Sequence, residues 1–153
     1  MRPILLVIAL CSACSASACP PAAATASPLP AARVQLVARH AEVADVLVSS
    51  IEGKPVQGQL MLKPLLRGEQ MTILELHYQP GTKAPIHTHT HESLIYVVSG
   101  RVKTWIGDEV FVLGPGDVAR HPPGVLHTVE ALVESTVVEI KSPPPDIPAL
   151  IGK

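Results

Sequence analysis

The sequence predicts an all-β fold, a barrel or a sandwich, in a single domain. Short runs rich in Val, Ile and Leu alternate with Pro and Gly clusters, and the 153 residues include 16 Pro and 10 Gly. Such punctuated runs are typical of many short strands joined by turns, and after residue 33 the apolar spacing favours no helix longer than about ten residues. Because 47% of the residues are hydrophobic but only 3% are aromatic, we expect an aliphatic core, which is enough to fill a small barrel.

Charge and cysteine placement restrict the function. The formal net charge of −1 argues against a nucleic-acid partner, because binding to phosphates needs an excess of Lys and Arg. The three cysteines, Cys11, Cys14 and Cys19, all precede the expected domain. They therefore neither cross-link that domain nor supply metal ligands inside it.

The first 26 residues have the order of an export signal. Arg2 precedes an apolar run at residues 4–10, and small residues follow, which is the layout of a secretory signal peptide. The run is shorter than the ~20 residues of a membrane span. Two processing sites fit: cleavage after Ala26 would leave Ser27 first, whereas a lipoprotein-like signal would leave a lipidated Cys19. We expect a periplasmic or secreted protein that is held at a membrane only if Cys19 is lipidated.

The parts of the mature chain follow from its turn residues. Residues 27–50 are expected to form a Pro/Ala-rich tether and an N-terminal extension, with strand residues near 34–37 and a helical turn near 41–47. A turn signal at residues 51–55 opens the expected barrel domain, residues 51–145. Residues 146–153 form the expected C-terminal tail, because a Pro-rich segment does not pair as a central strand.

Within residues 51–145 the β-rich runs predict six to ten strands. Turn signals such as Pro80-Gly81 and Gly107-Asp108 separate them, and the second is typical of a hairpin. The expected strands are residues 58–66, 71–78, 94–99, 101–106, 110–113, 118–121, 128–132 and 135–141.

Histidines are the candidate functional residues. His87, His89 and His91 alternate along one segment, and residues two apart on an extended strand face the same side. His127 follows a Pro-Pro-Gly turn that would bring a distant strand back across the barrel. Two neighbouring imidazoles and one from another strand form a donor set for a borderline divalent metal. The other histidines are given no ligand role: His40, His77 and His121.

Two segments resemble the conserved motifs of the cupin superfamily. The first motif reads Gly, five residues, His-x-His and a closing Gly, and is matched by Gly81, His87, His89 and Gly100. The second reads Gly, five residues, Pro-x-Gly, two residues and His, and is matched by Gly116, Pro122, Gly124 and His127. The run from His87 to Ser93 is similar to the His-x-His-x-His-Glu variant of small single-domain bacterial cupins, including the pectin-degradation type. The resemblance implies the cupin double-stranded β-helix, a jelly-roll barrel, with a divalent metal on His87, His89 and His127.

Two positions depart from the motifs. Ser93 occupies the position of the acidic ligand, and Ala131 that of a motif Asn. A serine hydroxyl is a weak ligand, so we expect Ser93 to hold a water near the metal. The fourth ligand is then a water, Glu92 or His91. Because binding requires neutral imidazoles, we expect metal occupancy to fall as the pH drops through about 6.5.

Such a site allows three functions. The first is a metal-dependent small-molecule enzyme, an isomerase, a lyase or a dioxygenase; the second is a non-catalytic module that binds a sugar or an organic acid; the third is a structural barrel without metal. Zn, Mn, Fe and Ni all accept imidazole, so the sequence selects no ion. It identifies no catalytic residue either, although Glu92 and Tyr96 are candidates for a general acid or base. Because small cupins often pair through their outer sheets, a homodimer is expected.

Overall fold

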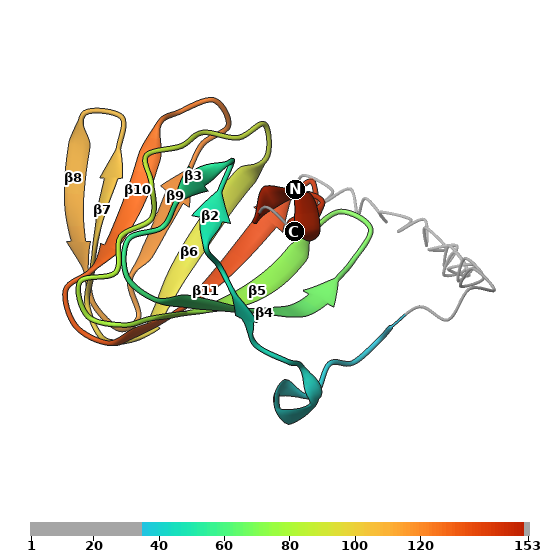
Figure 1. The fold of residues 1–153 in the computed structure, drawn as a ribbon. Helices are drawn as coiled ribbons and strands as arrows, with labels where there is room; N and C mark the ends of the chain where they lie inside the picture. The colour runs from blue at the N-terminus through green and yellow to red at the C-terminus, as the bar shows by residue number, and fades with distance from the viewer. Residues whose placement is uncertain (1–34, 152–153) are drawn as a thin grey trace, which may run out of the picture. The chain divides into compact units, whose positions relative to one another are not determined.

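The computed structural model describes residues 35–151, which form two main β-sheets (Figure 1). The larger sheet is antiparallel, in the order β1-β4-β5-β11-β6-β9. The last strand, β11, is central because it pairs with both β5 and β6. The strands of this sheet are β1 (Val46–Leu47), β4 (Leu60–Arg67), β5 (Thr72–Tyr78), β6 (Glu92–Ser99), β9 (Val118–His121) and β11 (Ser135–Ser142).

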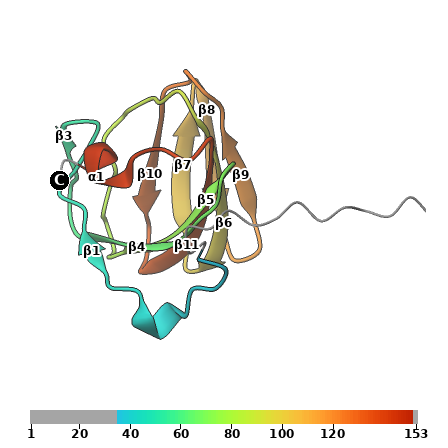
Figure 2. The same cartoon turned by 90° about the vertical axis from the view of Figure 1, so that its right-hand side faces the viewer.

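The second sheet has three strands in the order β10-β7-β8. Its free edge at β10 is covered by an irregular segment, in which the amide of Ala84 donates to the carbonyl of Val129 at 2.9 Å. The C-terminal helix α1 lies beside a small hairpin, β2 and β3 (Figure 2), and the amide of Glu52 donates to the carbonyl of Leu150. The remaining elements are η1 (His40–Glu42), β2 (Ser50–Ile51), β3 (Lys54–Pro55), β7 (Val102–Ile106), β8 (Glu109–Leu113), β10 (His127–Ala131) and α1 (Ile147–Leu150).

The core lies between the two sheets and is mostly aliphatic. Side chains alternate along β5, the strand between β4 and β11. Leu74 (0% exposed) and Leu76 are buried, while Ile73 faces outward. Val102 from β7 and Val129 from β10 join the same cluster from the opposite sheet. The expected all-β, jelly-roll barrel is therefore confirmed.

Both ends of the barrel differ from their expected form. The expected helical turn forms only at its start, as the 3-10 helix η1. Residues 46–47 form a strand because they pair with β4, and Val48 after them is 2% exposed in the core. Residues 35–37 form no strand. At the other end, Ile151 is 4% exposed and packs in the core, which the expected tail at 146–153 did not anticipate. The folded unit thus extends beyond residues 51–145 on both sides.

The expectations for the first residues fall outside the described part of the chain. The signal peptide at residues 1–26, cleavage before Ser27, lipidation of Cys19 and most of the tether belong to residues 1–34, which the structure does not describe. Among residues 35–151, no helix is long and apolar enough to cross a membrane.

The outer face of the larger sheet exposes apolar side chains. Leu94, Tyr96 and Val98 alternate outward along β6 and are 38–46% exposed, and Val118 on β9 is 59% exposed. Tyr96, a candidate general acid or base, therefore lies outside the barrel. This is the face through which the expected homodimer would form, and dimerisation stays a prediction.

Gly100 should be the most sensitive glycine of the barrel. Its φ is +85°, and an added Cβ would overlap the carbonyl oxygen of Glu134 and the side chain of Ser135. We expect Gly100→Ala to lower the free energy of unfolding by about 2–5 kcal/mol, since left-handed backbone strain and overpacking add. Gly116, with φ +91° and nothing within 4 Å of an added Cβ, is the matched control: Gly116→Ala should cost only about 1–2 kcal/mol. Urea denaturation measures both losses, and equal losses would contradict the overlap.

Candidate metal centre

Backbone pairing brings the two histidine segments together. The amide of His87 donates to the carbonyl of His127 at 3.1 Å, and the amide of His127 donates to the carbonyl of His87 at 2.9 Å. The amide of Gly124 also donates to the carbonyl of His89 at 2.9 Å. The turn before β10 and the segment at residues 82–91 are therefore fixed side by side by the main chain.

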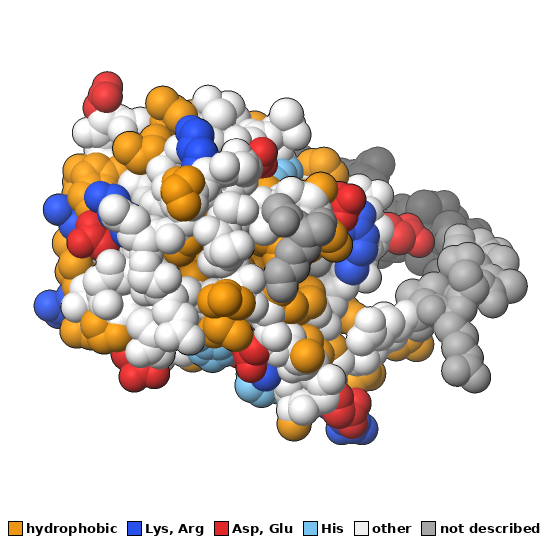
Figure 3. Space-filling view, viewed as in Figure 1, with side chains coloured by type: hydrophobic (Ala, Val, Ile, Leu, Met, Phe, Trp, Pro, Cys, Tyr) orange, Lys and Arg blue, Asp and Glu red, His pale blue; other side chains and the backbone are white. Residues whose placement is uncertain are grey.

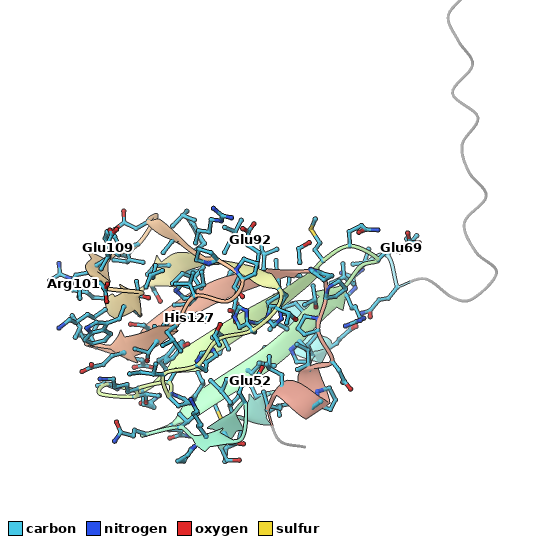
Figure 4. All side chains as sticks on the ribbon, turned by 90° about the horizontal axis from the view of Figure 1, so that it is seen from above. Glu52, Glu69, Glu92, Arg101, Glu109 and His127 are labelled. Atoms are coloured by element: carbon cyan, nitrogen blue, oxygen red, sulfur yellow. The ribbon has the colours of Figure 1, made fainter. Side chains whose placement is uncertain are left out.

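The side chains of the three predicted ligands converge inside the barrel. Along the extended segment, Thr88 and Thr90 are exposed while His87, His89 and His91 are buried, as the alternation predicts. One ring nitrogen from each of His87, His89 and His127 lies within 4.8 Å of the others. Figure 4 shows His127 inside the barrel, between the sheets.

The ring nitrogen left to bind a metal is Nε2 in each residue, and His89 Nε2 also lies 3.4 Å from the Ser93 hydroxyl. In all three residues Nδ1 lies within hydrogen-bond distance of a backbone carbonyl, which only accepts, so Nδ1 carries the proton and Nε2 is left with a lone pair. The pairs are His87 Nδ1 with Pro85 O (2.8 Å), His89 Nδ1 with His91 O (2.7 Å) and His127 Nδ1 with Val125 O (2.9 Å). Hydrogen bonds of this kind, from the ring nitrogen that does not bind the metal, orient histidine ligands in metal sites. This donor set fits a divalent ion.

Burial also keeps these imidazoles neutral. Desolvation lowers the pKa of His89 to about 3 and that of His127 to about 4, and it lowers the pKa of His87 as well. Protons therefore compete with a metal only in stronger acid than the pH of about 6.5 expected for a free imidazole. The expected pH for loss of metal moves down accordingly, for as long as the domain stays folded.

Two more buried histidines flank the three. His121 stacks on His127 with ring centroids 4.3 Å apart, and its Nε2 lies 3.1 Å from the Thr104 hydroxyl. That hydroxyl donates to the carbonyl of Thr128, so it accepts the Nε2 proton of His121 and leaves no lone pair there. His91 stacks on His89 at 3.7 Å, and its Nε2 is the only buried side-chain nitrogen or oxygen of residues 35–151 without a partner.

These contacts separate the alternatives for a fourth ligand. Glu92 forms an ion pair with Arg120, and Figure 4 shows it at the rim, away from His127. His91 keeps an unpartnered Nε2 and stacks on His89. It is the better protein candidate, although it is not part of the group whose ligand atoms lie within 4.8 Å of one another. The Ser93 hydroxyl accepts a hydrogen bond from Lys141 Nζ at 2.9 Å, and the water expected beside it stays a prediction.

A buried ion pair, which the sequence did not predict, lies beside the histidines. Lys141 Nζ lies 2.7 Å from Glu139 Oε1, and the two side chains are 4% and 12% exposed. Burial alone would raise the pKa of Glu139, but the adjacent ammonium outweighs it and holds this pKa far below the usual value. Burial alternates along β11, so that both charged side chains share the inward face with Val137.

A small cavity connects these groups. It has a volume of about 50 Å³ and is lined by aliphatic core residues together with polar groups that include His87, His127, Glu139 and Lys141. A space of this size holds a few water-sized groups. It therefore suits a metal ion with one small ligand group, while a larger molecule would have to reach in from the mouth.

The domain matches one protein family and several solved structures. Residues 74–140 match the family model described as "Cupin domain", and no curated protein matches the chain in sequence. A RmlC-like cupin from Shewanella frigidimarina is 20% identical, with 71% of this chain and 91% of that chain covered and a TM-score of 0.61. KdgF from Halomonas sp. is 23% identical, with 74% and 97% covered and a TM-score of 0.63. A predicted oxalate decarboxylase from Thermotoga maritima is 17% identical, with 70% and 98% covered and a TM-score of 0.63. At these identities the likeness shows a shared fold.

Proposed function

We propose that this chain, which carries a small cupin domain of the cupin-2 family, is a metal-dependent enzyme for a small anionic molecule. His87, His89 and His127 would hold the divalent ion. The observation that carries this proposal is the set of three Nδ1 atoms bound to backbone carbonyls, which leaves three Nε2 lone pairs for one ion. A metal held by three imidazoles keeps open positions and acts there as a Lewis acid.

The charges around the cluster favour an anionic ligand. Three neutral imidazoles leave a bound divalent ion with its full charge. Lys141 adds a buried ammonium that has three N–H donors, of which Ser93 and Glu139 engage two. The third can bind and orient a carboxylate or a comparable oxyanion. The cavity of about 50 Å³ admits only a small group of such a molecule beside the histidines.

The groups that can hold or move a proton in the barrel are Glu139 and Lys141. Both line the cavity together with His87 and His127, so a bound ligand would lie within their reach. Their buried position excludes bulk water from a reacting group. One solved neighbour is named a predicted oxalate decarboxylase, which is in keeping with a carboxylate ligand.

One contact favours the alternative, a non-catalytic module that binds a sugar or an organic acid. Glu139 is paired with Lys141 and its pKa is held far below its usual value, so it is a weak proton acceptor. In that case the chain would bind small carboxylates in a metal-dependent way without converting them. Nuclear magnetic resonance of the ligand during long incubation separates the two functions, because only an enzyme changes the ligand spectrum.

Metal content of the His127→Ala variant tests the site. Removing one of three ligands should release one equivalent of metal per chain relative to the untagged wild type, measured by elemental analysis after dialysis. The matched control is His121→Gln, because His121 is equally buried but its Nε2 bonds to Thr104; this variant should keep its metal. An unchanged metal content in His127→Ala would refute the three-histidine site.

We also propose that the protein is exported. The order of Arg2, the apolar run and the small residues up to Ala26 supports this, as an export signal has that layout. The ion would then be bound in the periplasm or outside the cell.

A further inference from the structure

A second group of metal-type ligands lies on the outside of the barrel. His40 Nε2 lies 2.6 Å from Glu75 Oε1, and His77 Nε2 lies 2.8 Å from the same oxygen. One ligand atom from each of the three residues lies within 4.8 Å of the others. Figure 3 shows histidine side chains reaching the surface at the lower edge of the view, on the side where η1 lies in Figure 1. This group is separate from the barrel histidines.

Strand geometry positions two members of the group. Glu75 and His77 are two apart on β5 and therefore share a face. It is the outer face, because Leu74 and Leu76, which alternate with them along the strand, point into the core. Thr136 is the register partner of His77 on β11, and its hydroxyl lies 3.2 Å from His77 Nδ1. That contact orients the ring so that Nε2 faces Glu75, as hydrogen bonds to the other ring nitrogen do for histidine ligands in metal sites.

The third member comes from the arm that precedes the barrel. His40 begins η1, none of whose residues is buried. Lys63 on β4 holds the following residues, since its Nζ donates to the carbonyl of Val43 at 3.1 Å and lies 3.5 Å from Asp45. The His40 side chain adds a contact from η1 itself to the sheet, through Glu75 on β5.

We propose that His40, Glu75 and His77 bind a second divalent ion, with Zn²⁺ as the best match, which clasps the N-terminal arm to the outer face of the sheet. Two imidazoles and a carboxylate are an established donor set for zinc, with a fourth position open for water. Tetrahedral zinc holds such ligand atoms about 3.3 Å apart. The present separations of 2.6 and 2.8 Å need to open by only about half an ångström, and His40, whose side chain is 59% exposed, is free to adjust.

Zinc titration of the untagged chain from residue 27 onward tests this clasp. Isothermal calorimetry should give two equivalents for the wild type and one for His77→Gln, in which the amide can still donate to Glu75 but is a poor zinc ligand. His127→Ala should also bind one equivalent, and the double variant should bind none. Equal stoichiometry in wild type and His77→Gln would overturn the second site. If His77→Gln binds one equivalent of zinc fewer than the wild type and His127→Ala binds as many as the wild type, the barrel site alone is overturned.

Proteolysis gives a second readout that stoichiometry does not provide. Arg39, directly before η1, is an exposed trypsin site. If zinc clasps the arm, it should slow cleavage after Arg39 at least several-fold in the wild type and in His127→Ala, but not in His77→Gln. Equal cleavage of the wild type with and without zinc would refute the clasp.

Discussion

Metal-free protein should unfold between pH 7 and about pH 4, well above the acidity that unfolds a typical barrel. Five buried histidines have a pKa lowered chiefly by burial: His87, His89, His91, His121 and His127. Burial lowers the pKa to about 3 for His89 and His121 and to about 4 for His91 and His127. In the unfolded chain each imidazole titrates near 6.5.

The sign of the effect follows from proton binding. Below pH 6.5 the unfolded chain takes up protons that the folded barrel does not, so the free energy of unfolding falls as the pH falls, until the folded pKa values near 3–4 are reached. Each unit between the two pKa values is worth about 1.4 kcal/mol per group. The summed loss is therefore of the same order as the 5–15 kcal/mol that stabilises an ordinary domain. Below pH 4.5 the lowered pKa of Glu139 adds a further loss.

Circular dichroism of chelator-treated protein across this pH range measures the transition. Bound metal should move the midpoint to lower pH, because the ion binds only the folded state. His121→Leu removes one titrating group that is outside the ligand set. The free energy of unfolding of this variant should therefore fall less steeply with pH, because about one proton fewer is taken up on unfolding. A constant free energy of unfolding between pH 7 and pH 4.5 would contradict the burial of the neutral imidazoles.

The positions of the barrel histidines could be predicted from sequence because they depend on local geometry. An extended backbone places alternate side chains on one side whether or not it belongs to a regular strand. The segment that contains His87 and His89 is irregular, with one isolated bridge between His87 and His127, yet its burial alternates as predicted. The proximity of His127 to this segment is not a local property, and it was predicted from the Pro-Pro-Gly turn before His127 and from the resemblance to the two cupin motifs.

The Glu139–Lys141 pair could not be predicted because β11 has two apolar alternations. Val138 and Ile140 fit an inward face as well as Val137 does, and charged residues are seldom buried. The sequence therefore favours Glu139 and Lys141 outside. Pairing with β5 and β6 on either side decides the orientation, and that long-range information is absent from the strand itself. The partner of the Ser93 hydroxyl was missed for the same reason.

The elements at the two ends of the barrel were still harder to predict from the sequence. Strands β1, β2 and β3 have two residues each, which is too short for any periodicity. Their positions depend on distant partners, such as the pairing of Val46 with Leu62 and of Leu47 with Met61. The helix α1 has four residues and follows a Pro-rich run, so its packing against the β2–β3 hairpin has no signal in the sequence.

Lys141→Met should destabilise the fold and at the same time strengthen metal binding. Removing the ammonium leaves Glu139 as an uncompensated buried charge, and breaking such a pair from one side costs about 3–5 kcal/mol. The double variant Lys141→Met, Glu139→Leu removes both charges and should recover most of this loss, because apolar replacement of a buried pair is often neutral or stabilising. Urea denaturation at pH 7 of the wild type, both single variants and the double variant gives the coupling energy.

Metal affinity should change in the opposite direction. Next to burial, the charge of Lys141 is the largest influence that lowers the pKa of His89; the same repulsion acts on a divalent ion bound at His89 Nε2, with twice the charge. Lys141→Met should therefore bind the barrel ion more tightly than the wild type, and it should bind small carboxylates more weakly because the third N–H donor is gone. A variant that is less stable and also binds metal less tightly would mean that the pair is needed to hold the histidines in place, and the proposed role of Lys141 as the anion's second cation would fail.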